Sequence, residues 1–153
     1  MRSFSILLLL AGTILAADKY DGPRPPLPDL PYLVHADNLI ATEAGEAKEE
    51  GGKNDTTYTM NGPASPARTP MAEPIFLLQS QKILPERLEL YRLDVKNGRR
   101  QLVVNKKRGK ALHLSVTKVD GNLYRVEAGE PLENGQYSLS PSDSNKVFCF
   151  EVY

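Results

Sequence analysis

The sequence contains very few of the residues that cross-link small domains or bind metal ions. Its only cysteine is Cys149, so no disulfide can form within the chain, and the hydrophobic core alone must hold the fold. Cys149 stands between Phe148 and Phe150, which predicts a small buried side chain rather than a reactive thiol. The only histidines are His35 and His113, whereas a catalytic zinc site usually draws on three protein ligands, at least two of them His or Cys. We therefore expect neither a metal site nor a cofactor.

Catalytic motifs are missing as well. The chain has no Gly-x-Ser-x-Gly segment, the signature of a large class of serine hydrolases. Its densest group of acids, in residues 43–50, lies in a glycine-containing stretch that is typical of a solvated loop and not of a glycosidase pair. These absences predict a protein that is not an enzyme. The alternative is a hydrolase, which would require His35, His113 and an acid to converge within hydrogen-bond reach.

A long apolar run occurs only near the start of the chain. Residues 1–17 begin with one positive charge, continue with an apolar run and end in small residues before the polar Asp18 and Lys19. The run is shorter than the roughly 20 apolar residues that a membrane-spanning helix needs. The pattern is typical of a cleavable signal peptide, with cleavage after Ala16 or Ala17. We therefore expect a secreted or periplasmic protein that does not span a membrane after cleavage.

The segment that follows, residues 18–31, is dominated by proline. Proline fixes φ and removes a backbone donor, so this density excludes a regular helix or a central strand and favours extended polyproline II. We expect a leader that acts either as a stiff spacer or as a strap packed on the domain. Its prolines are Pro23, Pro25, Pro26, Pro28 and Pro31.

The rest of the chain, residues 32–153, is typical of a single domain made of short β-strands. No window shows a sustained helical period. Instead, short apolar runs are separated by turn pairs such as Asn97-Gly98 and Asp120-Gly121, and Asn-Gly between two apolar runs is a strong hairpin signal. Seven to nine short strands with these turns predict an all-β fold, and within that class we favour an antiparallel β-sandwich.

The pattern also makes three local predictions. Residues 32–42 are long enough for one first strand, and the charged, glycine-containing residues 43–55 indicate an exposed loop. Between Leu90 and Leu93 the alternation slips, which indicates a β-bulge at that point.

Positive and negative charges balance over the chain, at 19 each, but their distribution is uneven. Residues 96–110 include seven basic side chains and no acid, and such a positive surface attracts anions. We interpret this basic stretch as a candidate surface for binding an anion or a partner. Two alternatives are that its lysines guard an exposed edge strand and that its charges pair with the acids of residues 43–50. The seven residues are Lys96, Arg99, Arg100, Lys106, Lys107, Arg108 and Lys110.

Together these features predict an exported, non-enzymatic binding or interaction module, and no motif is specific enough to indicate a family. An acidic protein, a polysaccharide or an anionic membrane surface would fit the basic stretch. Nucleic acid would not, because the stretch offers no aromatic side chain on which a base can stack. The main alternative is a small β-barrel-like cup that holds an apolar ligand.

Overall fold

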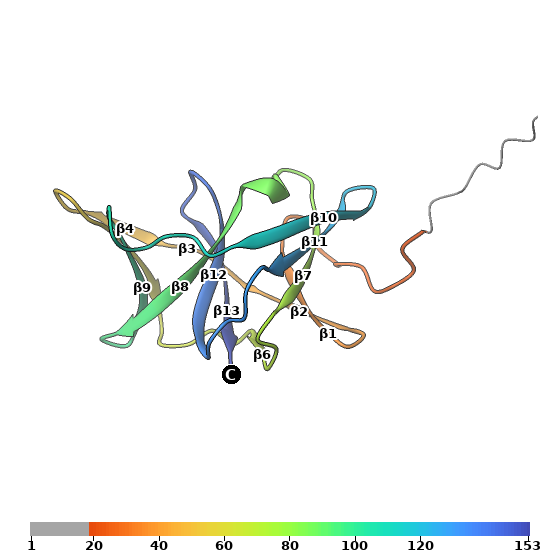
Figure 1. Ribbon diagram of the computed structural model, residues 1–153, viewed down its shortest axis with the longest axis horizontal. Coiled ribbons are helices and arrows are strands. Elements are labelled where there is room, and N and C mark those ends of the chain that lie inside the picture. Colours follow the sequence, from red (N-terminus) through yellow and green to blue (C-terminus); the bar gives the residue numbers. More distant parts are fainter. Residues whose placement is uncertain (1–18) are drawn as a thin grey trace, which may run out of the picture.

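Two antiparallel sheets make up the fold. The computed structural model describes residues 19–153, so the predicted signal peptide, residues 1–17, lies outside the described residues. The described part of the chain forms thirteen strands and one short 3-10 turn, Pro85–Arg87, with no α-helix (Figure 1). It contains no helix of the length and apolar character needed to cross a membrane. The predicted all-β, two-sheet class is confirmed, and the strands are more numerous than the seven to nine expected.

The smaller sheet has five strands in the order β10-β11-β7-β1-β2. All four neighbouring pairs in it are antiparallel. Because β7 and β11 stand between β10 and β1, the sheet brings together segments from both halves of the domain. Its strands are β1 (Tyr32–His35), β2 (Asn38–Ala41), β7 (Ile75–Gln79), β10 (Leu114–Asp120) and β11 (Leu123–Ala128).

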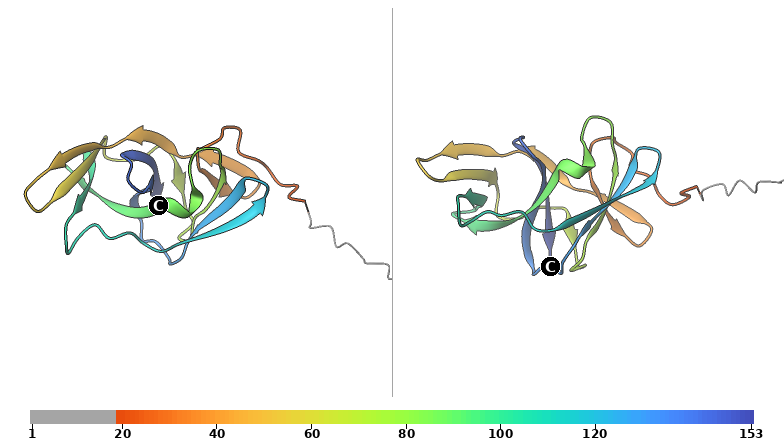
Figure 2. Two further views of the ribbon diagram at one scale, coloured as in Figure 1. Left: turned by 90° about the horizontal axis from the view of Figure 1, so that it is seen from above. Right: turned by 45° about the horizontal axis from the view of Figure 1, so that its top comes forward.

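The larger sheet has eight strands and is strongly curled. Its order is β3-β13-β12-β8-β9-β5-β4, and the two-residue β6 lies beside β13 in parallel. The strands at the two ends of this order, β3 and β4, are consecutive in the chain and separated only by Ala47. The chain thus links the two edges of the sheet, which curls into a half-barrel (Figures 1 and 2). Its strands are β3 (Glu43–Glu46), β4 (Lys48–Gly51), β5 (Thr56–Asn61), β6 (Arg68–Thr69), β8 (Leu88–Lys96), β9 (Arg99–Val104), β12 (Gly135–Pro141) and β13 (Lys146–Val152).

The main hydrophobic core lies between the two sheets. Phe150 of β13 packs edge to face on Phe76 of β7, with ring centroids 4.9 Å apart, and stacks on Tyr137 of β12 at 5.6 Å. In β8, β12 and β13 every second residue faces this core, as the two-residue period of a strand requires. These core residues are Leu88, Leu90, Tyr137, Leu139, Phe148, Phe150 and Val152.

The predicted turns and the predicted burial of the cysteine are confirmed. Asn97 and Gly98 connect β8 to β9 with φ values of 53° and 71°, and asparagine and glycine are the residues that tolerate this conformation best. Gly121, with φ of 56°, lies in the turn between β10 and β11. Cys149 is 1% exposed.

Three local predictions are wrong. Residues 32–42 form a hairpin of two strands instead of one strand, with a φ of 53° at Ala36 in the turn. Residues 43–51 form β3 and β4 instead of a loop, because backbone pairing with β13 and β5 stabilises this charged segment. The slip between Leu90 and Leu93 is not a bulge, since β8 keeps a continuous register with β12. Leu93 is instead buried on the opposite face of the strand from Leu90, in a separate cluster.

The described part of the proline-rich segment is a strap on the smaller sheet. The carboxylate of Asp29 accepts hydrogen bonds of 2.9–3.1 Å from the backbone N–H groups of Gln81, Lys82 and Ile83. Partial burial alone would raise the pKa of Asp29, but these three donors outweigh it and lower the pKa below its ordinary value. Of the two roles expected for this segment, the contacts of Asp29 therefore support the strap.

Candidate functional site: a cup inside the curled sheet

The inner face of the curled sheet surrounds an open hollow of about 440 Å³, which we call the cup. Side chains of six strands, β4, β5, β8, β9, β12 and β13, line the cup together with the turn between β12 and β13. This volume is within the range of small-molecule binding sites. The cup has an apolar floor, a mixed wall and a polar rim.

The floor of the cup is apolar and buried. Met60 of β5, Leu93 of β8 and Val147 of β13 are each less than 10% exposed and form one cluster with Ala47. Leu102 of β9 packs against this cluster and also lines the cup. The floor can therefore remove the apolar part of a ligand from water, the interaction that drives most small-molecule binding.

The wall above the floor combines aromatic rings with hydrogen-bonding groups. Glu89 and Tyr91 are two residues apart on β8 and so face the same side of the strand, and the Tyr91 phenol donates a short hydrogen bond to the Glu89 carboxylate. Burial raises the pKa of Tyr91, and the hydrogen bond and charge of Glu89 raise it further, so the phenol stays neutral. Tyr58 enters from β5, and the Ser138 and Ser140 hydroxyls lie 3.3 Å apart on β12.

The rim joins β4 to the turn between β12 and β13. The side-chain amide of Asn145 donates to Glu49 at 3.3 Å, and the backbone carbonyl of Asn145 accepts from the N–H of Ala47 at 2.8 Å. Asp143, at the tip of the turn, has φ of 61°, a conformation that aspartate tolerates better than most residues. Glu49, Asp143 and Asn145 are all exposed, so a ligand in the cup can reach these polar groups.

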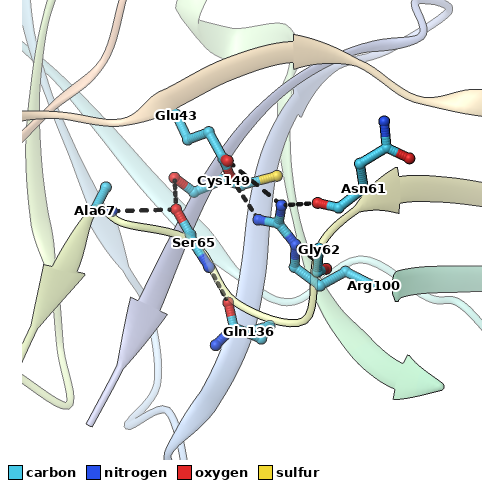
Figure 3. A network of polar contacts seen from close by, with 8 residues as sticks. All are labelled: Glu43, Asn61, Gly62, Ser65, Ala67, Arg100, Gln136 and Cys149. Atoms are coloured by element: carbon cyan, nitrogen blue, oxygen red, sulfur yellow. Dashed lines mark hydrogen bonds and ion pairs between the residues drawn. The ribbon is translucent and has the colours of Figure 1, made fainter. Parts of the chain in front are cut away.

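A buried polar network closes the opposite end of the curled sheet (Figure 3). The Arg100 side chain is 3% exposed and donates to the Glu43 carboxylate at 2.5 Å. It also donates to the backbone carbonyls of Asn61, at 2.6 Å, and Gly62, at 3.1 Å. A smaller hollow of about 190 Å³ lies at this end, and Met60 lines both hollows and so lies between them.

Cys149 lies beside this network and does not face the cup. Its backbone carbonyl accepts from the Ser65 hydroxyl at 3.2 Å, and the Ser65 N–H donates to Gln136 at 2.9 Å. Burial raises the pKa of the Cys149 thiol to about 12, so the thiol stays protonated at neutral pH. Cys149 belongs to the same apolar cluster as Met60 and Leu93 but does not line the cup.

The basic stretch is divided between one buried side chain and six exposed ones. Arg100 is buried, and it pairs with Glu43, as expected if the stretch matches the acids of residues 43–50. Lys96 and Arg99 flank the β8–β9 turn, whereas the remaining four follow β9 at its other end, roughly 20 Å away along a six-residue strand. Arg108 also lies 3.5 Å from Asp94. The role of the exposed residues in binding stays a prediction. These residues are Lys96, Arg99, Lys106, Lys107, Arg108 and Lys110.

The two histidines stand apart from the cup and from each other. His35 ends β1 and His113 precedes β10, and both are exposed. Strands β7 and β11 lie between them in the sheet order, which separates them by roughly 14 Å at normal strand spacing. Across residues 19–153, no group of three or more His, Cys, Asp or Glu side chains is arranged to hold a metal ion.

Reasoning from the sequence predicted a cup as an alternative but named none of its residues. The available signal was the alternation in β8. Leu88 and Leu90 face the core, and Glu89, Tyr91 and Leu93 occupy the alternate positions, on the other face of the strand. In an ordinary sandwich, that second face would be turned to solvent. Only the curling of the sheet turns it into the lining of a hollow.

The fold and the site together define a class, an all-β protein of two sheets in which one sheet curls around an open cup. Compared with family models, with curated proteins and with solved structures, the chain gives no significant match. The chemistry of the cup is therefore the basis on which its function is inferred.

Proposed function

We propose that the protein is a non-enzymatic binding protein that holds a small amphipathic molecule in the cup. The apolar part of this ligand lies on the floor formed by Met60, Leu93 and Val147, and its polar part faces the wall and the rim. We also propose that it acts in a secreted or periplasmic setting, on the basis of the signal-like residues 1–17.

The main support for this proposal is the unfilled space. Protein interiors are normally packed as densely as organic crystals, and cavities among apolar side chains cost stability. Here the same strands form a buried cluster on one side, around Tyr137 and Phe150, and leave about 440 Å³ open on the other. Folding alone does not require such a hollow, whereas a ligand site does.

The order of groups in the cup supports an amphipathic ligand over a purely apolar one. Small-molecule sites combine a mainly apolar lining with a few polar groups that fix orientation. In the cup these groups include Glu89, Tyr91 and Ser140, which line it together with the apolar floor. An entirely apolar occupant would remove water from these groups and offer no hydrogen bond in exchange, which is unfavourable.

The direct test is to extract and identify what the protein carries. Val104 lines the cup on β9, so Val104→Trp should fill the cup, whereas Val103→Trp places the same side chain on the opposite face of that strand. Each protein is purified from its native compartment, and its organic extract is analysed by mass spectrometry. We expect one small molecule in the extracts of the wild type and V103W that is missing from V104W. Identical extracts from all three proteins would contradict the proposal.

Binding through the basic stretch is a separate hypothesis, and the structure changes how it should be tested. Reversing the charge of Arg100 would break its buried pairing with Glu43, so an effect of that substitution would say nothing about a partner. Charge reversal at the exposed Arg99, Lys106 and Lys107 is the informative variant. Unchanged association of that variant with every anionic surface tested would favour edge protection instead.

A further inference from the structure

The charges in the cup are all of one sign. Among the residues that line it, three are acidic, Glu49, Glu89 and Asp143, and none is basic. Two basic side chains that adjoin the lining in sequence have other contacts. Lys48 pairs with Glu50 at 3.7 Å, and the Lys146 ammonium lies 5.9 Å from the centre of the Phe148 ring.

No cation of the described chain neutralises these three acids. Seven ion pairs are present among residues 19–153, and none of them includes Glu49, Glu89 or Asp143. Elsewhere in the same sheet the half-buried Glu43 is matched by Arg100. Glu89 is half-buried, and a negative charge that is partly shielded from water interacts more strongly with a counter-charge than it would in bulk water. The cup is thus an unmatched negative site above an apolar floor.

Aromatic rings stand beside this charge. Tyr58 enters from β5 and Tyr91 from β8, with β9 between these strands in the sheet. The faces of tyrosine rings attract cations, and rings combined with carboxylates are a recurring way to bind ammonium groups. Neutral phenols and carboxylates can also bind a sugar, but a neutral ligand would leave the three negative charges unmatched. An anionic head group would be repelled by them.

Building on the proposed function, we propose that the ligand of the cup is an organic cation with an apolar tail. Its ammonium group lies near Glu89, Tyr58 and Tyr91, and its tail lies on Met60, Leu93 and Val147. Glu49 and Asp143 at the rim attract the cation during entry, since a surface potential opposite in sign to the ligand raises association rates.

Three probes with the same tail and different head groups test this inference. They are octyltrimethylammonium, octyl glucoside and octyl sulfate, each titrated into the protein by calorimetry below its micelle-forming concentration. We expect the cation to bind about tenfold more tightly than the glucoside, and the sulfate to show no saturable binding. Added salt should weaken binding of the cation and leave the glucoside unaffected.

A charge-neutral variant identifies the carboxylate that matters. Glu89→Gln should lower the affinity for octyltrimethylammonium by about threefold to tenfold and leave octyl glucoside unchanged. Glu130→Gln is the matched control, because Glu130 is exposed, forms none of the ion pairs and does not line the cup. V104W should abolish binding of every probe, whereas V103W should retain it. Thermal unfolding of each variant confirms that it is folded.

The possible outcomes separate the two proposals. Equal binding of the cation and the glucoside, with both blocked by V104W, would overturn the cationic ligand and leave the binding function standing. Tighter binding of the sulfate, or an E89Q variant that binds the cation as well as the wild type does, would also overturn the cationic ligand. Failure of all three probes to bind, or binding that V104W leaves intact, would overturn both proposals.

Discussion

Strands β8, β12 and β13 have two faces, and the two faces meet very different surroundings. Toward the smaller sheet they present large apolar side chains such as Leu90, Tyr137 and Phe150, packed in one buried cluster. Toward the inside of the curl they present Glu89, Tyr91 and Ser138, which surround an open volume. The comparison shows that the two-residue alternation of a strand can direct one set of side chains into a core and leave the other set free for binding.

The polar groups that hold each region also differ. The curled sheet is closed by the buried Arg100, which is matched by Glu43 and two carbonyls. The smaller sheet is held from outside by Asp29, whose carboxylate collects three backbone N–H groups. The charges of Arg100 and Asp29 are thus matched by hydrogen-bonding partners, whereas the three acids of the cup take part in none of the ion pairs of residues 19–153.

The largest expected effect is on the filled face. Phe150→Ala removes a fully buried ring that contacts both Phe76 and Tyr137, so the free energy of unfolding should fall by about 3–5 kcal/mol. Tyr91→Ala on the cup face should cost about 1 kcal/mol, because the ring is only half-buried beside a hollow. Denaturant unfolding of both variants measures the difference. Equal losses would show that the two faces are packed alike, against the comparison.

The next effect tests the closure of the curled sheet. Glu43→Gln leaves the buried Arg100 guanidinium without its carboxylate, and breaking a fully buried pair in this way costs about 3–5 kcal/mol. Since the Glu43 side chain is 33% exposed, we expect a smaller loss, of about 2 kcal/mol. Glu46→Gln, an exposed change on the same strand, should be nearly neutral in the same unfolding assay. A neutral Glu43→Gln would mean that the two backbone carbonyls are enough to hold Arg100.

The Asp29 strap should give a smaller effect that depends on pH. Because the pKa of Asp29 is lowered in the folded state, its ionised form stabilises the fold above the unfolded value of about 3.9. That contribution is lost as the pH falls through the folded-state pKa. We expect Asp29→Asn to cost about 1 kcal/mol at pH 7, and its difference from the wild type to shrink as the solution is acidified below about pH 4.

Unfolding curves at several pH values measure this dependence for the Asp29 variant. Asp37→Asn changes an exposed aspartate in the β1–β2 turn and serves as the control. A difference between Asp29→Asn and the wild type that grows on acidification would contradict the role given to Asp29.

The smallest effect, that of Ala47→Val, is measured by comparing the same substitution on the two faces. Ala47→Val adds volume beside the cup and should raise the free energy of unfolding by about 0.5 kcal/mol. Ala128→Val adds the same volume to the packed core between the sheets and should lower it by about 1–3 kcal/mol. Opposite signs in one denaturant series support the comparison, and a loss in both would show that the floor of the cup has no spare room.

Much of the fold could be predicted from the sequence because its signals are local. Asn97-Gly98 forms a tight hairpin through its own backbone preference, and the all-β class follows from short apolar runs between such turns. The burial of Cys149 follows from its two phenylalanine neighbours. The prediction failed for residues 43–51, which carry charges typical of a loop and are held as strands only by partners that are distant in sequence.

The candidate site could be predicted only in outline. Arg100 is grouped with six other basic residues in the sequence because a sequence shows charge and not burial. The predicted bulge before Leu93 assumes that the alternation of β8 serves one core, whereas it serves two. The sequence allowed a cup as an alternative, but it indicated no residue of the lining.

The sequence by itself determined the strands and turns whose signals are local, since strand alternation and turn chemistry depend on neighbours along the chain. Only the tertiary structure decided that one sheet would curl. That outcome depends on β3 pairing with β13 while β4, one residue later, pairs with β5. These pairings between distant segments leave no periodic signal in the sequence, because backbone groups can form hydrogen bonds whatever side chain the residue carries. The cup and its unmatched acids therefore exist only in the folded protein, where the two edges of the sheet are brought together.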